Sequence, residues 1–129
     1  MSKLQKRTLG AFGLVAAIGA LLTGVFVASP EGQAPRHPVH EISLEARGTA
    51  FNGVNPTIEA KVGEKLRIVV RNSDPGILHE IAVPSLGTGT KEIGSGEEVV
   101  LEVPLDRPGT YEYVCPRHEA MMKGTIVVR

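Results

Sequence analysis

The chain has 129 residues, with 14 basic and 14 acidic groups, four histidines, one cysteine and no tryptophan. This length favours one small domain, and a single cysteine excludes an intramolecular disulfide and a four-cysteine zinc or iron–sulfur site. Beyond residue 7 the chain has 11 basic against 14 acidic groups, and this net charge of −3 excludes a nucleic-acid binder that depends on bulk positive charge.

The first segment has the pattern of a membrane anchor or a signal peptide. Three basic residues, the last of them Arg7, precede Leu9–Ala28, which is apolar or small throughout and, at about 20 residues, long enough to span a bilayer as a helix. A signal peptide usually has a shorter apolar region and a small-x-small cleavage site, and no candidate site fits well. The sequence therefore favours an uncleaved anchor over residues 1–29, with a cleaved signal as the alternative. Both send residues 30–129 to the extracytoplasmic, periplasmic side.

Residues 30–39 are predicted to form a linker, because Ser29–Pro38 is rich in proline, glycine and polar residues. The domain proper is expected over residues 40–129. Short strand patterns separated by turn signals are found there at His40–Ala46, Thr57–Val62, Lys65–Arg71, His79–Val83, Glu97–Val103, Thr110–Val114 and Thr125–Arg129.

Several of these segments alternate as a half-buried sheet does. Leu66, Ile68 and Val70 share one face of their predicted strand, and Tyr113 and Cys115 share one face of another. No long helical pattern occurs after the apolar segment. About seven short strands predict an all-β fold, namely an antiparallel β-sandwich.

The residues that could carry chemistry lie mostly near the end of the chain. Cys115 ends a predicted strand, and His118, Met121 and Met122 follow within one loop before the last strand. His79 lies near the start of an earlier predicted strand. A soft thiolate, two imidazoles and a weak thioether suit copper, because Cu(I) prefers soft sulfur and Cu(II) prefers nitrogen. A rigid ligand geometry between those that Cu(I) and Cu(II) prefer needs little rearrangement when the ion gains or loses one electron.

Each of these residues has a simpler explanation when it is taken alone. A single cysteine is most often a small buried hydrophobe, and a single histidine or methionine most often has a structural place. Their order and spacing together favour a metal site. Zinc on the same three strong ligands is an alternative, whereas a cysteine nucleophile has no third group to orient its base. His37 and His40 lie in or beside the linker and are left out of the site.

At these positions the sequence resembles the cupredoxins, the small blue-copper proteins, over roughly residues 40–129. Members have a histidine on an early strand and a Cys–His–Met loop just before the last strand. His79 matches the early histidine, and Cys115 and His118 match the Cys-x-x-His spacing of the plastocyanin and amicyanin types. The loop that begins at His118 is similar to the azurin loop, in which Met-Lys-Gly-Thr leads into the last strand. The turn Asn72–Gly76 is also similar to the turn before the first ligand.

The resemblance implies a Greek-key β-sandwich of seven to eight strands that holds one type 1 copper ion, Cu(I) or Cu(II). Met121 lies three residues after His118, as in amicyanin, and Met122 lies four after it, as in azurin. Met122 also stands two before Gly124, a spacing that most members keep. Met122 is therefore the preferred axial ligand and Met121 the alternative. The implied metal ligands are His79, Cys115, His118 and Met122.

Two positions depart from the family pattern. Many members place asparagine directly after the early histidine, where it ties the two ligand segments together, but this chain has Glu80. Many place serine or threonine after the cysteine, but this chain has Pro116, which has no backbone N–H. Such neighbouring groups tune a bound metal, so both departures bear on the reduction potential.

The resemblance implies an electron-transfer protein with no catalytic residues, not an enzyme. His118 would reach the surface as the electron port, and redox partner proteins would dock there briefly on an apolar rim. The rim is expected to consist of Pro75, Ile77, Leu78, Leu86, Ala120 and Met121. The protein is expected to be a monomer, attached to the membrane through residues 8–29 if these are not cleaved, and not to bind nucleic acid. The alternative function is a copper carrier or assembly factor that hands Cu(I) to another exported protein.

Overall fold

The computed structural model describes residues 36–129, so the predicted anchor or signal and most of the predicted linker lie outside the described residues. Within residues 36–129 the chain forms nine strands and two short 3₁₀ turns. These are β1 (Val39–Arg47), β2 (Ala50–Phe51), β3 (Ile58–Ala60), β4 (Lys65–Asn72), β5 (Ala82–Val83), η1 (Pro84–Leu86), β6 (Thr88–Gly89), β7 (Glu98–Pro104), β8 (Gly109–Val114), η2 (Pro116–His118) and β9 (Lys123–Val128). In this part of the chain, no helix has the length and apolar character that crossing a membrane requires.

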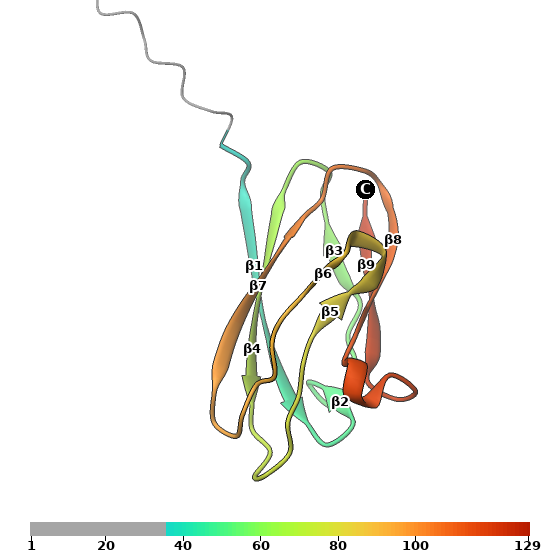
Figure 1. Cartoon of the computed structure of the whole chain (residues 1–129). Coiled ribbons are helices and arrows are strands. Elements are labelled where there is room, and N and C mark those ends of the chain that lie inside the picture. The colour runs from blue at the N-terminus through green and yellow to red at the C-terminus, as the bar shows by residue number, and fades with distance from the viewer. Residues whose placement is uncertain (1–35) are drawn as a thin grey trace, which may run out of the picture. The chain divides into compact units, whose positions relative to one another are not determined.

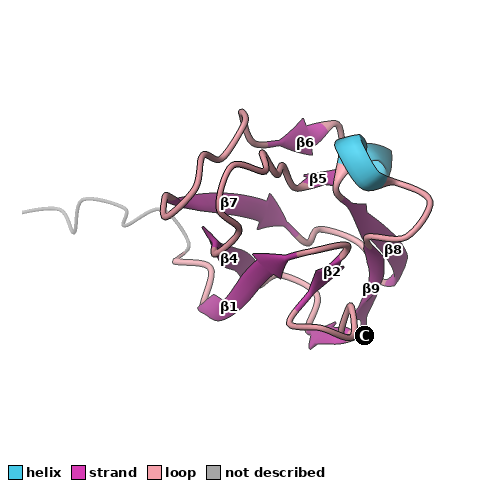
Figure 2. Cartoon of the chain, turned by 90° about the horizontal axis from the view of Figure 1, so that it is seen from below, coloured by secondary structure: helices cyan, strands magenta, loops and turns pink. Residues whose placement is uncertain are grey.

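The strands form two sheets that lie face to face, as the side view and the end view show (Figures 1 and 2). One sheet has the order β2-β1-β4-β7 and the other has the order β3-β9-β8-β5-β6. The predicted all-β sandwich is therefore confirmed. The prediction of seven to eight strands is wrong, because β2 and β6 have only two residues each, too few to show an alternating pattern.

The prediction of purely antiparallel sheets is also wrong. β1 and β4 are parallel, from Val39 opposite Lys65 to Ala46 opposite Asn72, and β3 and β9 are parallel as well. Because β3 lies in the other sheet, the chain leaves the sheet of β1 and returns to it at β4 by a crossover instead of a hairpin. Local alternation does not encode this orientation.

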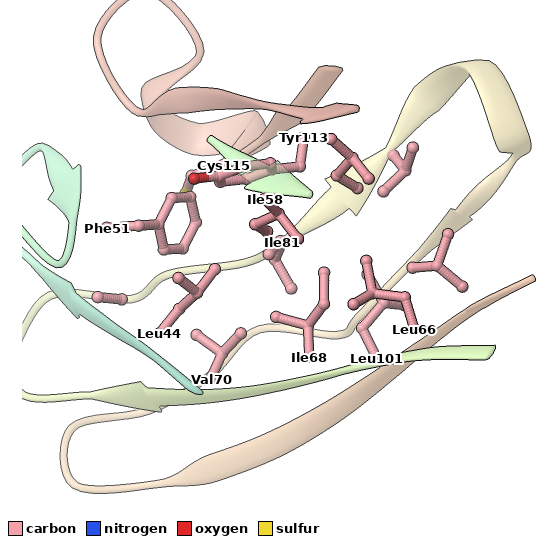
Figure 3. Close-up of a cluster of buried hydrophobic side chains, with 14 of the residues drawn as sticks. Leu44, Phe51, Ile58, Leu66, Ile68, Val70, Ile81, Leu101, Tyr113 and Cys115 are labelled. Carbon is pink, nitrogen blue, oxygen red and sulfur yellow. The ribbon is translucent and has the colours of Figure 1, made fainter. Parts of the chain in front are cut away.

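The core lies between the two sheets and comes from the alternation that the sequence shows. Leu66, Ile68 and Val70 of β4 are fully buried and point toward the opposite sheet (Figure 3). Tyr113 and Cys115 extend the same core from the side of β8. Each aliphatic side chain of this kind contributes about 1.5–3 kcal/mol when it is fully buried, so the core fixes the strands that carry the site.

One end of the sandwich gathers the segments that follow β4 and β8. Ala82 of β5 lies opposite Val114, the last residue of β8, and His79 forms an isolated bridge with Ile93. The predicted strand over His79–Val83 is therefore shorter than expected, since only its last two residues form β5. The turn η2 lies at this end, away from the start of β1 (Figure 1). This arrangement brings two segments that are distant in sequence next to each other.

Candidate metal centre

Three of the four predicted ligands lie together at this end of the sandwich. The candidate donor atoms of His79, Cys115 and His118 are all within 4.8 Å of one another. The Cys115 Sγ atom is 4.0 Å from His79 Nδ1 and 3.5 Å from His118 Nδ1. His79 and Cys115 are fully buried, whereas His118 is half-buried. The structure thus places a thiol and two imidazoles around one point that is accessible from the side of His118.

The ligand loop, Cys115–Met122, is closed by backbone hydrogen bonds. The Cys115 N–H donates to the Met122 carbonyl at 2.9 Å, and the Met122 N–H donates to the His118 carbonyl at 2.8 Å. The His118 N–H donates to the Cys115 carbonyl at 2.9 Å. Pro116 begins η2, where the missing N–H of proline removes no helical bond. The loop therefore holds His118 near Cys115 without help from a side chain at position 116.

The two methionines of the loop lie in different surroundings. Met122 is fully buried and belongs to the same core cluster as Cys115, whereas 63% of Met121 is exposed. The Met121 carbonyl accepts a hydrogen bond of 2.9 Å from Asn55 Nδ2, which attaches the loop to the segment between β2 and β3. Burial therefore favours Met122 over Met121 as the fourth ligand. This ligand assignment stays a prediction.

His79 is fixed from both its backbone and its ring. Its N–H donates to the Ile93 carbonyl at 3.2 Å, and its carbonyl accepts from the Ile93 N–H at 2.8 Å. The ring atom Nε2 lies 2.7 Å from Asp74 Oδ2. The hydrogen bond with His79 holds the pKa of Asp74 below its ordinary value, against the opposing effect of burial and with help from the Gly48 N–H.

The sequence places Asp74 in a turn and indicates no role for it at the site. The available signal was an acidic residue in the turn five positions before the ligand histidine. Asn72, a fully buried residue, completes this turn. Its Nδ2 donates to the carbonyls of Ile77 at 2.7 Å and Ile93 at 2.8 Å, and its Oδ1 accepts from the Asp74 N–H at 2.8 Å. The segment before His79 is therefore held by buried side chains.

Glu80, which stands where many cupredoxins have asparagine, pairs with Arg117 of the ligand loop. Arg117 Nε lies 3.5 Å from Glu80 Oε2, and Arg117 Nη2 pairs with Glu92 Oε1. These pairs join the loop to the segments on both sides of the His79 bridge. Since all three side chains are partly exposed, water screens the pairs and their contribution to stability is small. They provide a link where many cupredoxins use asparagine.

The predicted apolar rim is found in part. Ile77, Leu78 and Met121 are exposed large hydrophobic side chains, and Pro75 and Ala120 are exposed as well. Leu86 does not belong with them. It is half-buried and lines a hollow with Pro104, Asp106, Arg107 and Tyr111. That hollow lies at the other end of β7, because Pro104 pairs with Lys65 at the start of β4.

The donor set suits copper better than other common metals. Two imidazoles, one thiolate and a nearby thioether are the ligand types of blue-copper sites, and no carboxylate joins this cluster in the part of the chain that the structure describes. The residues present therefore fit one copper ion.

Comparisons with known proteins agree with this fold. The metal-binding domain of the Cu(I)-exporting P-type ATPase of Streptococcus pneumoniae D39 is similar, with a TM-score of 0.60, 22% identity and coverage of 74% of this chain and 91% of that one. Auracyanin A, a "blue" copper protein of Chloroflexus aurantiacus, has a TM-score of 0.61, 18% identity and coverage of 70% and 99%. A copper binding protein solved in its apo form has a TM-score of 0.58, 28% identity and coverage of 75% and 93%.

No curated protein matches the sequence. The model of one family, the cupredoxin-like domain, matches residues 15–128. That match spans most of the chain and includes the three clustered residues and both methionines. The chain therefore belongs to the cupredoxin-like domain family.

Proposed function

We propose that this protein is a mononuclear type 1 copper protein that transfers single electrons between partner proteins. His79, Cys115, His118 and Met122 would hold the ion. The observation that carries the proposal is the buried Cys115 thiol with two imidazoles within 4.8 Å, inside a cupredoxin sandwich. Bound copper supplies a one-electron couple, Cu(II)/Cu(I). An electron would come from a reduced protein donor and leave to an oxidised protein acceptor, with no substrate turned over.

The surroundings of the cluster support electron transfer. Both ligand segments are held by short hydrogen bonds, so the donor atoms have little freedom to move when the charge of the site changes. His118 is half-buried, which gives the centre a path to the surface. The exposed side chains of Ile77, Leu78 and Met121 offer a small apolar area for brief docking, as weak redox encounters use.

The location is part of the same proposal. The basic start and the apolar segment Leu9–Ala28 support an extracytoplasmic domain that is anchored by, or cut from, its N-terminal segment. This assignment rests on the sequence alone. Protease digestion of cells tests it when the outer barrier is opened and the cytoplasmic membrane is intact. We expect the domain to be cleaved while a cytoplasmic marker protein stays intact. Protection of both proteins would contradict the assignment.

A second candidate function is a Cu(I) carrier, and one observation favours it. Met121 has an exposed side chain three residues after the half-buried His118. A soft thioether at the surface is a suitable first contact for Cu(I) that leaves the site toward a partner. The two functions differ in one respect. An electron carrier keeps its copper through repeated reduction and oxidation, whereas a carrier loses Cu(I) to an acceptor.

The first test is the visible spectrum of the full chain after Cu(II) is added, beside a Cys115→Ser variant. We expect an intense thiolate-to-copper charge-transfer band in the wild type and none in the variant, because serine supplies no thiolate. Repeated electrochemical cycling with copper analysis then separates electron transfer from copper delivery. A band of equal strength in the variant would refute the assignment of Cys115 as a ligand.

The two methionines provide a matched pair of variants. Met122→Leu should keep a copper site but raise its reduction potential, because Cu(I) is stable with the three remaining ligands whereas Cu(II) loses a donor that it needs more. Met121→Leu should leave the potential unchanged, because the Met121 side chain points into solvent. If Met121→Leu raises the potential and Met122→Leu does not, the axial ligand is Met121.

A further inference from the structure

The two histidines of the centre differ in what lies behind their rings. His79 Nε2 is 2.7 Å from Asp74 Oδ2, and both side chains are almost fully removed from solvent, with exposures of 0% and 10%. For His118, the only ring contact of this kind within residues 36–129 is with Cys115. A carboxylate therefore stands behind one ligand of the centre and not behind the other.

This contact determines which ring nitrogen of His79 faces the metal site. An ionised carboxylate can only accept hydrogen bonds, so Nε2 of His79 carries the hydrogen that it donates to Asp74. The other nitrogen, Nδ1, is then left with a free lone pair, and it is the atom that lies 4.0 Å from the Cys115 sulfur. The hydrogen bond thus selects the tautomer that can bind a metal beside the thiolate.

Asp74 is itself held in place by hydrogen bonds with Gly48 and Asn72. The Gly48 N–H donates to the same oxygen, Oδ2, at 2.5 Å, and the Asp74 N–H donates to Asn72 Oδ1 at 2.8 Å. Gly48 has a φ of +60°, in the turn between β1 and β2, where a side chain would be strained. Arg47 adds a weaker electrostatic attraction to the Asp74 carboxylate. The carboxylate is therefore fixed behind His79 by the fold.

We propose that Asp74 is a positioning residue of the copper centre, which orients His79 and favours Cu(II) over Cu(I) through its negative charge. The inference rests on the function proposed above. Oxidation adds one positive charge to the site, and the buried Asp74 carboxylate lies one imidazole ring away. The attraction between these charges is stronger in the protein interior than it would be at the same distance in water. Carboxylates behind metal-bound histidines also raise the basicity of the ring and commonly affect metal affinity by about 10- to 100-fold.

Two substitutions separate position from charge. In Asp74→Asn the amide oxygen can still accept from Nε2, but the negative charge is gone. In Asp74→Ala both are gone. Asp106→Asn is the matched control, because it removes one negative charge from an exposed loop next to Pro104, at the end of β7 away from the centre. All three are compared in the full chain, with circular dichroism to establish that each variant folds.

The first measurement needs no copper. In the apo protein with ¹⁵N-labelled histidine, two-bond ¹H–¹⁵N correlations report which ring nitrogen of His79 is protonated. We expect the Nε2–H form in the wild type and in Asp74→Asn, and a mixture of both tautomers in Asp74→Ala. An unchanged tautomer in folded Asp74→Ala overturns the positioning role.

The second measurement is the reduction potential of the copper-loaded proteins. For Asp74→Asn we expect affinity for Cu(II) relative to Cu(I) to fall about tenfold, which corresponds to an increase of about 59 mV for a one-electron couple. Asp106→Asn should not change the potential. A potential unchanged in Asp74→Asn, with the charge-transfer band intact, overturns the inference alone. Absence of that band from the wild type instead refutes the proposed function.

Discussion

The two halves of the candidate metal centre are built in different ways. On the His79 side, the buried side chains of Asn72 and Asp74 hold the ligand, and they also bind two other segments, at Gly48 and Ile93. On the side of Cys115–Met122, the loop is closed by its own backbone hydrogen bonds, and one of its members, His118, is half-exposed. One half depends on the whole fold, whereas the other is largely local.

Under the proposed function, the two halves would have different roles. A ligand that is fixed by a buried network resists movement when the charge of the site changes, which keeps reorganisation small. A ligand on a short surface loop can contact a partner without disturbing that network. Substitutions in the two halves should therefore fail in different ways, and the following predictions run from the largest effect to the smallest.

Gly124→Ala should break the loop half at its base. Gly124 of β9 lies directly opposite Tyr113 of β8, and an added Cβ would overlap the Tyr113 ring. The ring is buried and packs against Phe51 at a centroid distance of 5.5 Å, so it has no free space into which to move. We expect the free energy of unfolding to fall by about 3 kcal/mol, as in other overpacked cores. Urea denaturation of the apo protein measures this loss.

Gly94→Ala is the control for that substitution. Its added Cβ would meet only the end of the Glu97 side chain, at 3.1 Å. That side chain is exposed and flexible, so it can move away. A cost below about 1 kcal/mol is expected. Equal losses in the two variants would show that the Tyr113 ring is not what requires glycine at position 124.

Asn72→Ala should break the His79 half. The substitution leaves the Asp74 N–H without its partner in a buried hydrogen bond, and it removes the buried bond from Asn72 to the Ile93 carbonyl. We expect a loss of about 2 kcal/mol, because unsatisfied buried polar groups keep their full desolvation cost. Copper affinity should fall with it, since Asp74 and His79 lose their support. Ser73→Ala, which changes a half-buried neighbour, is the control. Calorimetry measures the Tm of both variants and of the wild type, with and without copper.

The centre is predictable from the sequence because the family's ligand order is a pattern in the chain itself. His79, Cys115 and His118 were predicted, and the structure brings all three together. The buried β4 face was also predicted, because Leu66, Ile68 and Val70 alternate with exposed or half-buried residues. Such features are local in sequence or repeat with a fixed period.

What the sequence did not show depends on contacts between distant segments. The parallel pairing of β1 with β4 follows from a crossover between sheets, which no local pattern records. The hydrogen bond between Asp74 and His79 follows from the shape of the intervening turn, since the same residues in an open loop would face solvent. Leu86 was assigned to the wrong end because position in the sandwich depends on strand direction.

The smallest expected effect concerns Tyr113, which ties β8 to the chain before β3. Its hydroxyl donates to the Pro56 carbonyl at 2.6 Å, and burial raises its pKa to about 12. At neutral pH, Tyr113→Phe should therefore cost about 1 kcal/mol, the value of one hydrogen bond. This change lies in the half of the centre that contains the ligand loop, but it leaves the loop's own backbone bonds intact, so the spectrum of the copper-loaded protein should be unchanged.

The difference in stability between the wild type and Tyr113→Phe should depend on pH. An unfolded tyrosine loses its proton near pH 10, whereas the folded one keeps it until about pH 12, so the unfolded state binds fewer protons in that interval. The wild type should therefore lose stability relative to Tyr113→Phe by up to about 1.4 kcal/mol per pH unit between pH 10 and 12. The two stabilities should cross at about pH 11 if the hydrogen bond is worth about 1 kcal/mol. A difference that stays constant from pH 8 to 12, measured by urea denaturation, would mean that Tyr113 ionises as readily in the folded protein as in the unfolded one, and that the base of the ligand loop is open to water.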